Sequence, residues 1–151
     1  MSFDPKTASQ LAEGLNESGL HLFRRIHGSP NMLAAICSSA VLLSLSVEVG
    51  IKALLEKHSG KFLRSHDHEE LFRALPVPVQ NELSGRFRSE AIAETVYGAG
   101  AEPPKLEAVL AQTKNTFEVW RYVYEPGAKP HINYGEYAAL ARALAGAMNA
   151  A

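Results

Sequence analysis

The chain has 151 residues, a formal net charge of −1 and a sequence pI of about 6.6. This length suits one compact domain, here residues 1–151. The near-neutral charge argues against broad electrostatic adhesion to nucleic acid, although a local basic patch is compatible with it. The one cysteine, Cys37, cannot form an internal disulfide, so nothing demands an oxidising compartment.

The N-terminus shows no basic segment followed by an apolar core, so the sequence predicts no signal peptide and a cytoplasmic protein. The uncharged run at residues 29–47 is almost long enough to span a bilayer. However, it contains Asn31 and several serines, and no tryptophan or tyrosine belt flanks it. This composition favours the buried helix of a soluble protein, without a membrane partner.

The first predicted helix begins with Asp4 as its N-cap and Pro5 at its first position. Gly14 and Gly19 weaken its middle, so we expect a break in this helix near Ser18 and Gly19. The longest predicted helix follows, over residues 30–57, with Ser29 as a candidate N-cap. Its apolar residues do not keep to one stripe, so we expect this helix to be buried on most sides.

The interior of the long helix carries small residues and one pair of opposite charges. Ser46 and Gly50 would let neighbouring helices approach closely. Glu48 and Lys52 lie four residues apart in otherwise apolar surroundings. Because an unpaired buried charge is costly, we expect both side chains to be partly buried and paired.

The remaining helices follow from caps and breakers. Asp67 is a candidate N-cap for a short helix at residues 68–75, and Glu70 is its capping-box partner. Prolines then stop that helix. Further helices are predicted at residues 79–97, 105–125 and 134–148. No stretch alternates with period two, so we predict no sheet and an all-α antiparallel helical bundle of five to six helices.

The run His66, Asp67, His68 suggests the metal site of a His-Asp phosphohydrolase. Such a site needs a further aspartate downstream, but Asp4 and Asp67 are the only aspartates in the chain. The sequence therefore lacks the full set of metal ligands, and we predict neither a metal nor a cofactor. A helix cap with flanking histidines is the favoured interpretation.

The densest polar and aromatic cluster covers residues 120–125, with Trp120 and Tyr124 expected on one buried helix face. Arg121 is a candidate phosphate-binding fork beside rings that can stack on a base. Alternatively, Arg121 and Glu125 form an ordinary ion pair one helical turn apart. The following loop carries His131.

The segments LSVEVGIKALL at residues 45–55 and HDHEELFRAL at residues 66–75 resemble the HEPN superfamily. Members carry a glutamate-then-lysine helix followed by a His-Asp start to the next helix. The resemblance implies an antiparallel helical bundle that is often homodimeric. It also implies an association with RNA cleavage or nucleotide binding, frequently in toxin–antitoxin or phage-defence systems.

HEPN ribonucleases carry an arginine and a histidine separated by four to six residues, late in the fold. The matching arginine here would be Arg121, but nine residues separate it from His131. The catalytic motif is thus absent in its usual form. This difference favours a binding, non-catalytic member over a ribonuclease.

Three hypotheses remain open. The leading one is a dimeric, HEPN-like protein that binds RNA or a nucleotide. The second is a metal-independent ribonuclease of the same fold that uses Arg121 and a displaced His131. The third is a structural or regulatory module that binds a partner protein. The candidate ligand-binding residues are Glu48, Lys52, His66, Asp67, Arg121, Tyr124 and Glu125. A homodimer is also expected because the long helix has more apolar residues than one bundle face needs.

Overall fold

The computed structural model describes residues 4–28, 30–127 and 131–150, with the side chain of Arg121 outside the description. The described residues form helices and no strand, which confirms the predicted all-α class. The helices are α1 (Pro5–Arg24), α2 (Met32–Ser59), α3 (His68–Ala74), α4 (Val77–Ala93), α5 (Leu106–Thr113), α6 (Thr116–Arg121) and α7 (Tyr134–Asn149).

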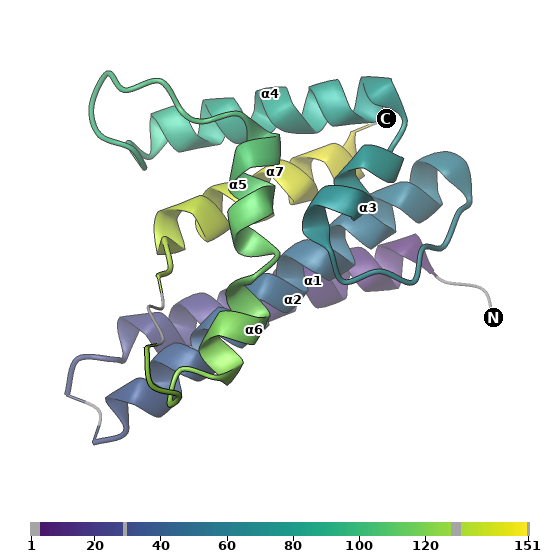
Figure 1. The fold of residues 1–151 in the computed structure, drawn as a ribbon. Helices are drawn as coiled ribbons and strands as arrows, with labels where there is room; N and C mark the ends of the chain where they lie inside the picture. Colours follow the sequence, from purple (N-terminus) through teal and green to yellow (C-terminus); the bar gives the residue numbers. More distant parts are fainter. Residues whose placement is uncertain (1–3, 29, 128–130, 151) are drawn as a thin grey trace.

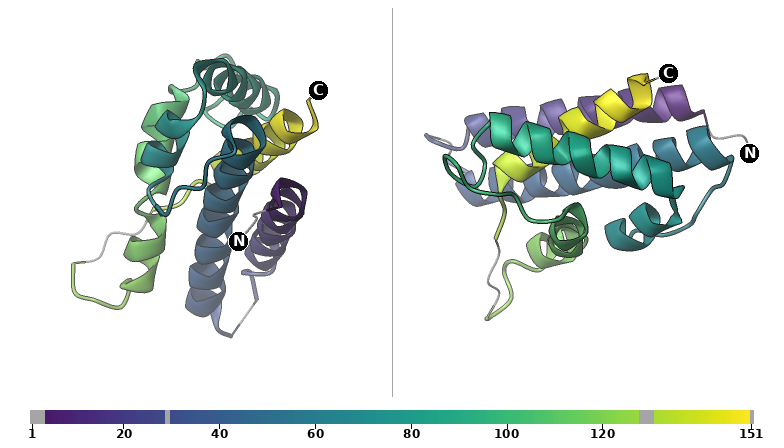
Figure 2. Two further views of the ribbon diagram at one scale, coloured as in Figure 1. Left: turned by 90° about the vertical axis from the view of Figure 1, so that its right-hand side faces the viewer. Right: turned by 90° about the horizontal axis from the view of Figure 1, so that it is seen from above.

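The helix α2 is the axis of the bundle (Figure 1). Its antiparallel neighbour α1 lies along one side, and α7 packs against both of them. The helix α4 covers α7, and the two run in opposite directions. The short helices α3, α5 and α6 lie on the side of α2 that faces away from α1 (Figure 2). The candidate site is built on that side.

Small residues let α2 approach its two long neighbours. Gly19 of α1 faces Leu43, and an added Cβ at Gly19 would lie 2.8 Å from a Leu43 carbon. The hydroxyl of Ser46 donates to the carbonyl of Ala12 at 2.9 Å. An added Cβ at Gly50 would likewise lie 2.9 Å from a carbon of Leu144 on α7. The prediction of close approach at Ser46 and Gly50 is confirmed. The predicted break near Gly19 was wrong, because α1 is continuous there and Gly19 packs against Leu43.

The helix boundaries follow the predicted caps in part. Asp4 and Asp67 cap α1 and α3 through bonds to backbone amides, as predicted. The start predicted for α2 was wrong by two residues, since its N-cap is Asn31 and Pro30 precedes the helix. Ser29 lies outside the described residues.

The predicted start of the fourth helix was also late, because α4 begins at Val77 with Pro78 in its first turn. Proline is tolerated there since the first amides of a helix have no intrahelical acceptor. This helix ends at Ala93, four residues before the predicted end.

The single helix predicted at residues 105–125 was wrong, because α5 ends at Thr113 and α6 begins at Thr116. The hydroxyl of Thr113 bonds to the carbonyl of Leu110 and to the ring of His68, and such local bonds compete with the helical ladder. The second piece is short and ends at Arg121. Residues 122–125 therefore do not continue the helix.

The second half of α2 is core, but the first turns are not. Val47, Ile51 and Leu54 are at most 1% exposed, whereas Met32 and Leu33 are 52% and 55% exposed. The prediction that α2 is buried on most sides was thus wrong for its N-terminal part. By length and composition α2 could cross a membrane. Its packing at the centre of the bundle is compatible with a soluble protein.

The contact between Gly19 and Leu43 yields the first prediction. Gly19→Ala should lower the free energy of unfolding by about 1–3 kcal/mol, because its Cβ would overlap Leu43 and crowd the carbonyl of Ser39. Gly14→Ala, on the same helix with open space around it, is the control. It should be neutral or stabilising, by about 0.5–1 kcal/mol. Urea unfolding of both variants measures the difference; equal stabilities would refute the close approach.

Candidate ligand-binding cleft

A nearly buried ion pair lies at the middle of α2. The Nζ atom of Lys52 is 2.7 Å from Oε1 of Glu48, and both side chains are only 12% exposed. Nδ1 of His66 lies 3.1 Å from each oxygen of the same carboxylate. Burial raises the pKa of Glu48, but hydrogen bonds from Lys52 and His66 outweigh it and hold the pKa below its usual value. Glu48 is therefore ionised at neutral pH, and the predicted pairing with Lys52 is confirmed.

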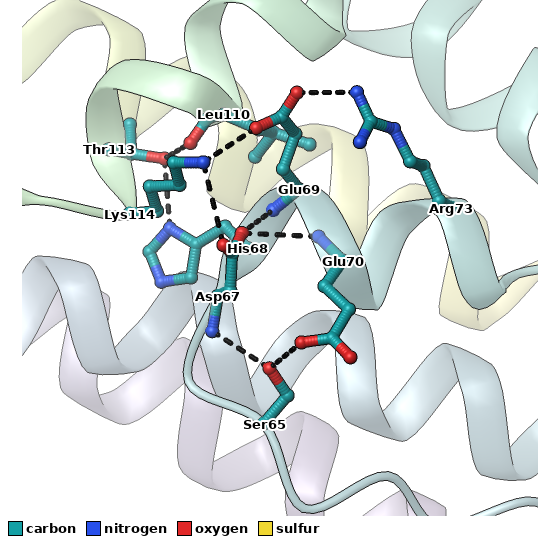
Figure 3. Close-up of polar contacts among 9 residues, drawn as sticks. All are labelled: Ser65, Asp67, His68, Glu69, Glu70, Arg73, Leu110, Thr113 and Lys114. Carbon is teal, nitrogen blue, oxygen red and sulfur yellow. Dashed lines mark hydrogen bonds and ion pairs between the residues drawn. The ribbon is translucent and has the colours of Figure 1, made fainter.

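Asp67 connects the loop after α2 to the start of α3 (Figure 3). Its Oδ1 accepts from the amides of Glu69 and Glu70 at 2.9 and 3.2 Å. The amide of Asp67 donates to the hydroxyl of Ser65, which in turn donates to the carboxylate of Glu70. The predicted capping box therefore forms only indirectly, because Ser65 lies between the carboxylate of Glu70 and the amide of Asp67. Burial raises the pKa of Asp67, but the two backbone bonds and Lys114 lower it below its ordinary value.

Lys114, in the turn between α5 and α6, ties that turn to α3. Its Nζ lies 2.7 Å from Glu69 and 3.4 Å from Asp67 (Figure 3). Arg73 contacts the other oxygen of Glu69 at 2.6 Å. The hydrogen bond to Glu69 is the main reason that the pKa of Lys114 is raised. Lys114 is a residue that the sequence analysis did not single out, because its partners lie some 45 residues away.

His68 is enclosed where α2, α3 and α5 meet. Its side chain is 1% exposed, and Nδ1 lies 2.9 Å from the hydroxyl of Thr113 (Figure 3). Burial lowers the pKa of His68 from 6.5 to about 4, against the opposing effect of Glu48 and Asp67. The ring is therefore neutral at pH 7. No group of three side chains suited to a metal ion occurs among the described residues.

A cleft of about 810 Å³ lies among these residues, between α2, the loop that leads into α3, and α6 with the turn before it. We call it the polar cleft. Its lining residues are Ser44, Leu45, Glu48, His66, Asp67, Lys114, Asn115, Phe117, Glu118 and Tyr122. Three predicted site residues meet there, namely Glu48, His66 and Asp67. Lys52 does not line the cleft but contacts Glu48.

The other predicted site residues lie elsewhere. Tyr124 is 74% exposed, so the prediction of a buried face shared with Trp120 was wrong; the chain has left the helix before Tyr124. Glu125 is exposed in the turn that follows, and it is not one helical turn from Arg121. His131 is exposed and does not line the polar cleft. The side chain of Arg121 lies outside the description, so its proposed role stays a prediction.

Tyr124 lines a second hollow, which we call the apolar groove. It measures about 990 Å³ and lies between the first turns of α2 and the helix α6. Its walls include Met32, Leu33, Cys37, Phe117, Trp120 and Tyr124. Phe117 is shared with the polar cleft, so the two hollows are neighbours.

Comparison of the chain with protein-family models, with curated proteins and with solved structures finds no match. The resemblance to the HEPN superfamily therefore stays a prediction.

The ion pair on α2 yields a second prediction. Glu48→Gln should lower the free energy of unfolding by about 2–4 kcal/mol, because it leaves the ammonium of Lys52 nearly buried and unpaired. Glu82→Gln is the matched control, since Glu82 and Arg86 form a pair of the same spacing that is 36–40% exposed. It should cost only about 0.3–0.5 kcal/mol. Guanidinium unfolding measures both; a loss for Glu48→Gln as small as the control would refute this account.

The burial of His68 yields a third prediction. Below pH 6.5 the unfolded chain binds a proton at His68 that the folded chain does not accept until about pH 4. Stability should therefore fall as the pH drops through this window, by about 2 kcal/mol between pH 7.5 and pH 5. The pKa values of Glu48 and Asp67 are lowered, so their contributions are lost only at lower pH.

Urea unfolding at pH 7.5 and pH 5 is the test. His68→Gln should remove the dependence in this window, whereas His58→Gln, at the exposed end of α2, should retain it. The assignment to His68 fails if the dependence survives in His68→Gln.

Proposed function

We propose that the polar cleft binds a nucleotide, free or as part of a short single-stranded RNA, and that the protein does so in the cytoplasm without cleaving it. The observation that carries the proposal is the meeting of Glu48, His66 and Asp67 with exposed aromatic rings around one hollow of about 810 Å³. Sites for small ligands typically have volumes of about 300–1,000 Å³. The HEPN-like segments at residues 45–55 and 66–75 contribute this same wall, which agrees with the ligand class that the resemblance implies.

The α6 wall of the cleft suits a nucleobase. Phe117 and Tyr122 are 42% and 40% exposed, although both are aromatic. A base stacked on such a ring gains about 1–3 kcal/mol, whichever base it is. Asn115 lies in the adjoining turn and can both donate to and accept from a base edge. The carboxylate of Glu118 adds an acceptor for exocyclic amines or ribose hydroxyls.

The charges of the cleft favour recognition of base and sugar over phosphate. Glu48 is paired with Lys52, and Lys114 is paired with Glu69 and Asp67. These cations are therefore already neutralised, and little positive charge remains to attract a polyanion. Affinity should then depend only weakly on salt, since few counterions are released on binding. Arg121, at the end of α6, is the residue that we propose to contact a single phosphate.

The ribonuclease hypothesis lacks a matching observation. His131 is exposed before α7 and does not line the polar cleft. A general base must come within hydrogen-bond reach of the 2′-hydroxyl that it deprotonates. We therefore propose binding without RNA cleavage. Robust metal-independent cleavage by the wild type, lost in His131→Ala, would reverse this choice.

Two tyrosines of α6's C-terminal turn give the fourth prediction. Tyr122 lines the polar cleft and Tyr124 lines the apolar groove, but their rings lie 6.5 Å apart, so the control has to keep the ring of Tyr124. Tyr122→Ala should weaken the binding of nucleoside monophosphates and short oligonucleotides by about tenfold or more, through the loss of stacking. Tyr124→Phe, which keeps the ring beside Tyr122, should bind like the wild type.

Isothermal titration calorimetry with the four ribonucleoside monophosphates and a short oligouridine measures these affinities. A salt series tests the weak dependence on ionic strength. Absence of any binding by the wild type at millimolar ligand, or equal losses in both variants, would contradict the proposal.

A further inference from the structure

The three carboxylates that line the polar cleft differ in what they contact. Glu48 is paired with Lys52, and Asp67 accepts hydrogen bonds from two backbone amides and lies beside Lys114. The side chain of Glu118 is exposed in the cleft, and no described group forms an ion pair or hydrogen bond with its carboxylate. Two of the three carboxylates therefore hold the fold together, whereas that of Glu118 is open to a ligand.

Asn115, in the turn before α6, is a second polar side chain that the cleft leaves open. It is exposed, lines the same cleft and makes no hydrogen bond to the amides of α6 through its side chain. Glu118 follows three residues later and Tyr122 seven residues later, a spacing that places all three on one face of α6. A base stacked on the ring of Tyr122 would thus present its edge to an amide and a carboxylate.

The amide and the carboxylate together offer one donor beside two acceptors. The amide of Asn115 can donate an N–H, whereas an ionised carboxylate has two oxygens that only accept. Among the four bases of RNA, guanine alone has the complementary edge, with the O6 acceptor beside the N1–H and N2–H donors. Adenine, cytosine and uracil each have one donor on this edge with an acceptor next to it. They would therefore place a lone pair against the second carboxylate oxygen.

We propose that the nucleotide bound in the polar cleft is a guanine nucleotide, with its N1–H and N2–H donating to Glu118 and its O6 accepting from Asn115. This inference rests on the proposed function, because it names the base for the same cleft. Glu118 is then the residue that determines specificity. A site built to accept two hydrogen bonds rejects a base that lacks the donors, because the carboxylate is desolvated without partners.

Inosine monophosphate is the sharpest probe, because it keeps the O6 and N1–H of guanine and lacks only the 2-amino group. Calorimetry should show that the wild type binds GMP about tenfold or more tightly than AMP, CMP or UMP, with inosine monophosphate between them. Glu118→Gln should reduce this preference to about twofold or less, because glutamine has one acceptor and turns an N–H toward a guanine donor. Glu125→Gln removes the same charge just after α6 and outside the cleft, so it should keep the preference.

Pentanucleotides separate the two forms in which guanine could be bound. UUGUU should bind more tightly than UUAUU to the wild type but not to Glu118→Gln. If UUGUU binds more tightly than GMP, the ligand is a segment of RNA, and the reverse order assigns a free nucleotide. Circular dichroism verifies that each variant is folded.

The outcomes distinguish this inference from the proposed function. Equal affinities of the wild type for the four nucleotides, or a preference for GMP that survives in Glu118→Gln, would overturn the inference and leave the proposed function standing. Absence of binding by any nucleotide would overturn both.

Discussion

The ion pair between Glu48 and Lys52 is the interaction on which the rest of the cleft depends. An apolar helix at the centre of a bundle can hold a carboxylate at 12% exposure only if a cation neutralises it. The same carboxylate then accepts from His66, which holds the loop after α2 against the helix. The charge in the core thus positions the first side chain of the cleft. Loss of Glu48 would release both partners at once.

The opposite wall is held by a different kind of contact. Neutral His68 contacts Thr113 where α3 meets the end of α5. Lys114 bridges Glu69 and Asp67 at the same junction. The buried hydrogen bond and the partly buried ion pairs together fix α3 against the end of α5. Because Thr113 and Lys114 are adjacent, these contacts also determine where α5 ends and in which direction α6 continues. The direction of α6, and with it the aromatic wall, follows from this junction.

The sequence alone was enough for the features that depend on local chemistry. The caps at Asp4 and Asp67, the pairing of Glu48 with Lys52 and the absence of strands from the described residues could all be predicted, because each depends on residues within a few positions. The break after Thr113 could not, since periodicity continues across it and its cause is a contact with His68. Lys114 was missed for the same reason. Tyr124 was misplaced because the prediction extended a helix beyond the packing that supports it.

The division of α5 from α6 has a consequence for unfolding. The chain has one tryptophan, and Trp120 lies in α6, a helix of only 6 residues whose main neighbour is the partly exposed half of α2. Its indole nitrogen is buried without a hydrogen-bond partner among the described residues, which weakens its attachment further. Intrinsic fluorescence therefore reports on the least stable helix of the bundle, whereas far-ultraviolet ellipticity reports mainly on the long ones. In a monomer the two signals would follow separate transitions, with α6 detaching before the core around α2 melts.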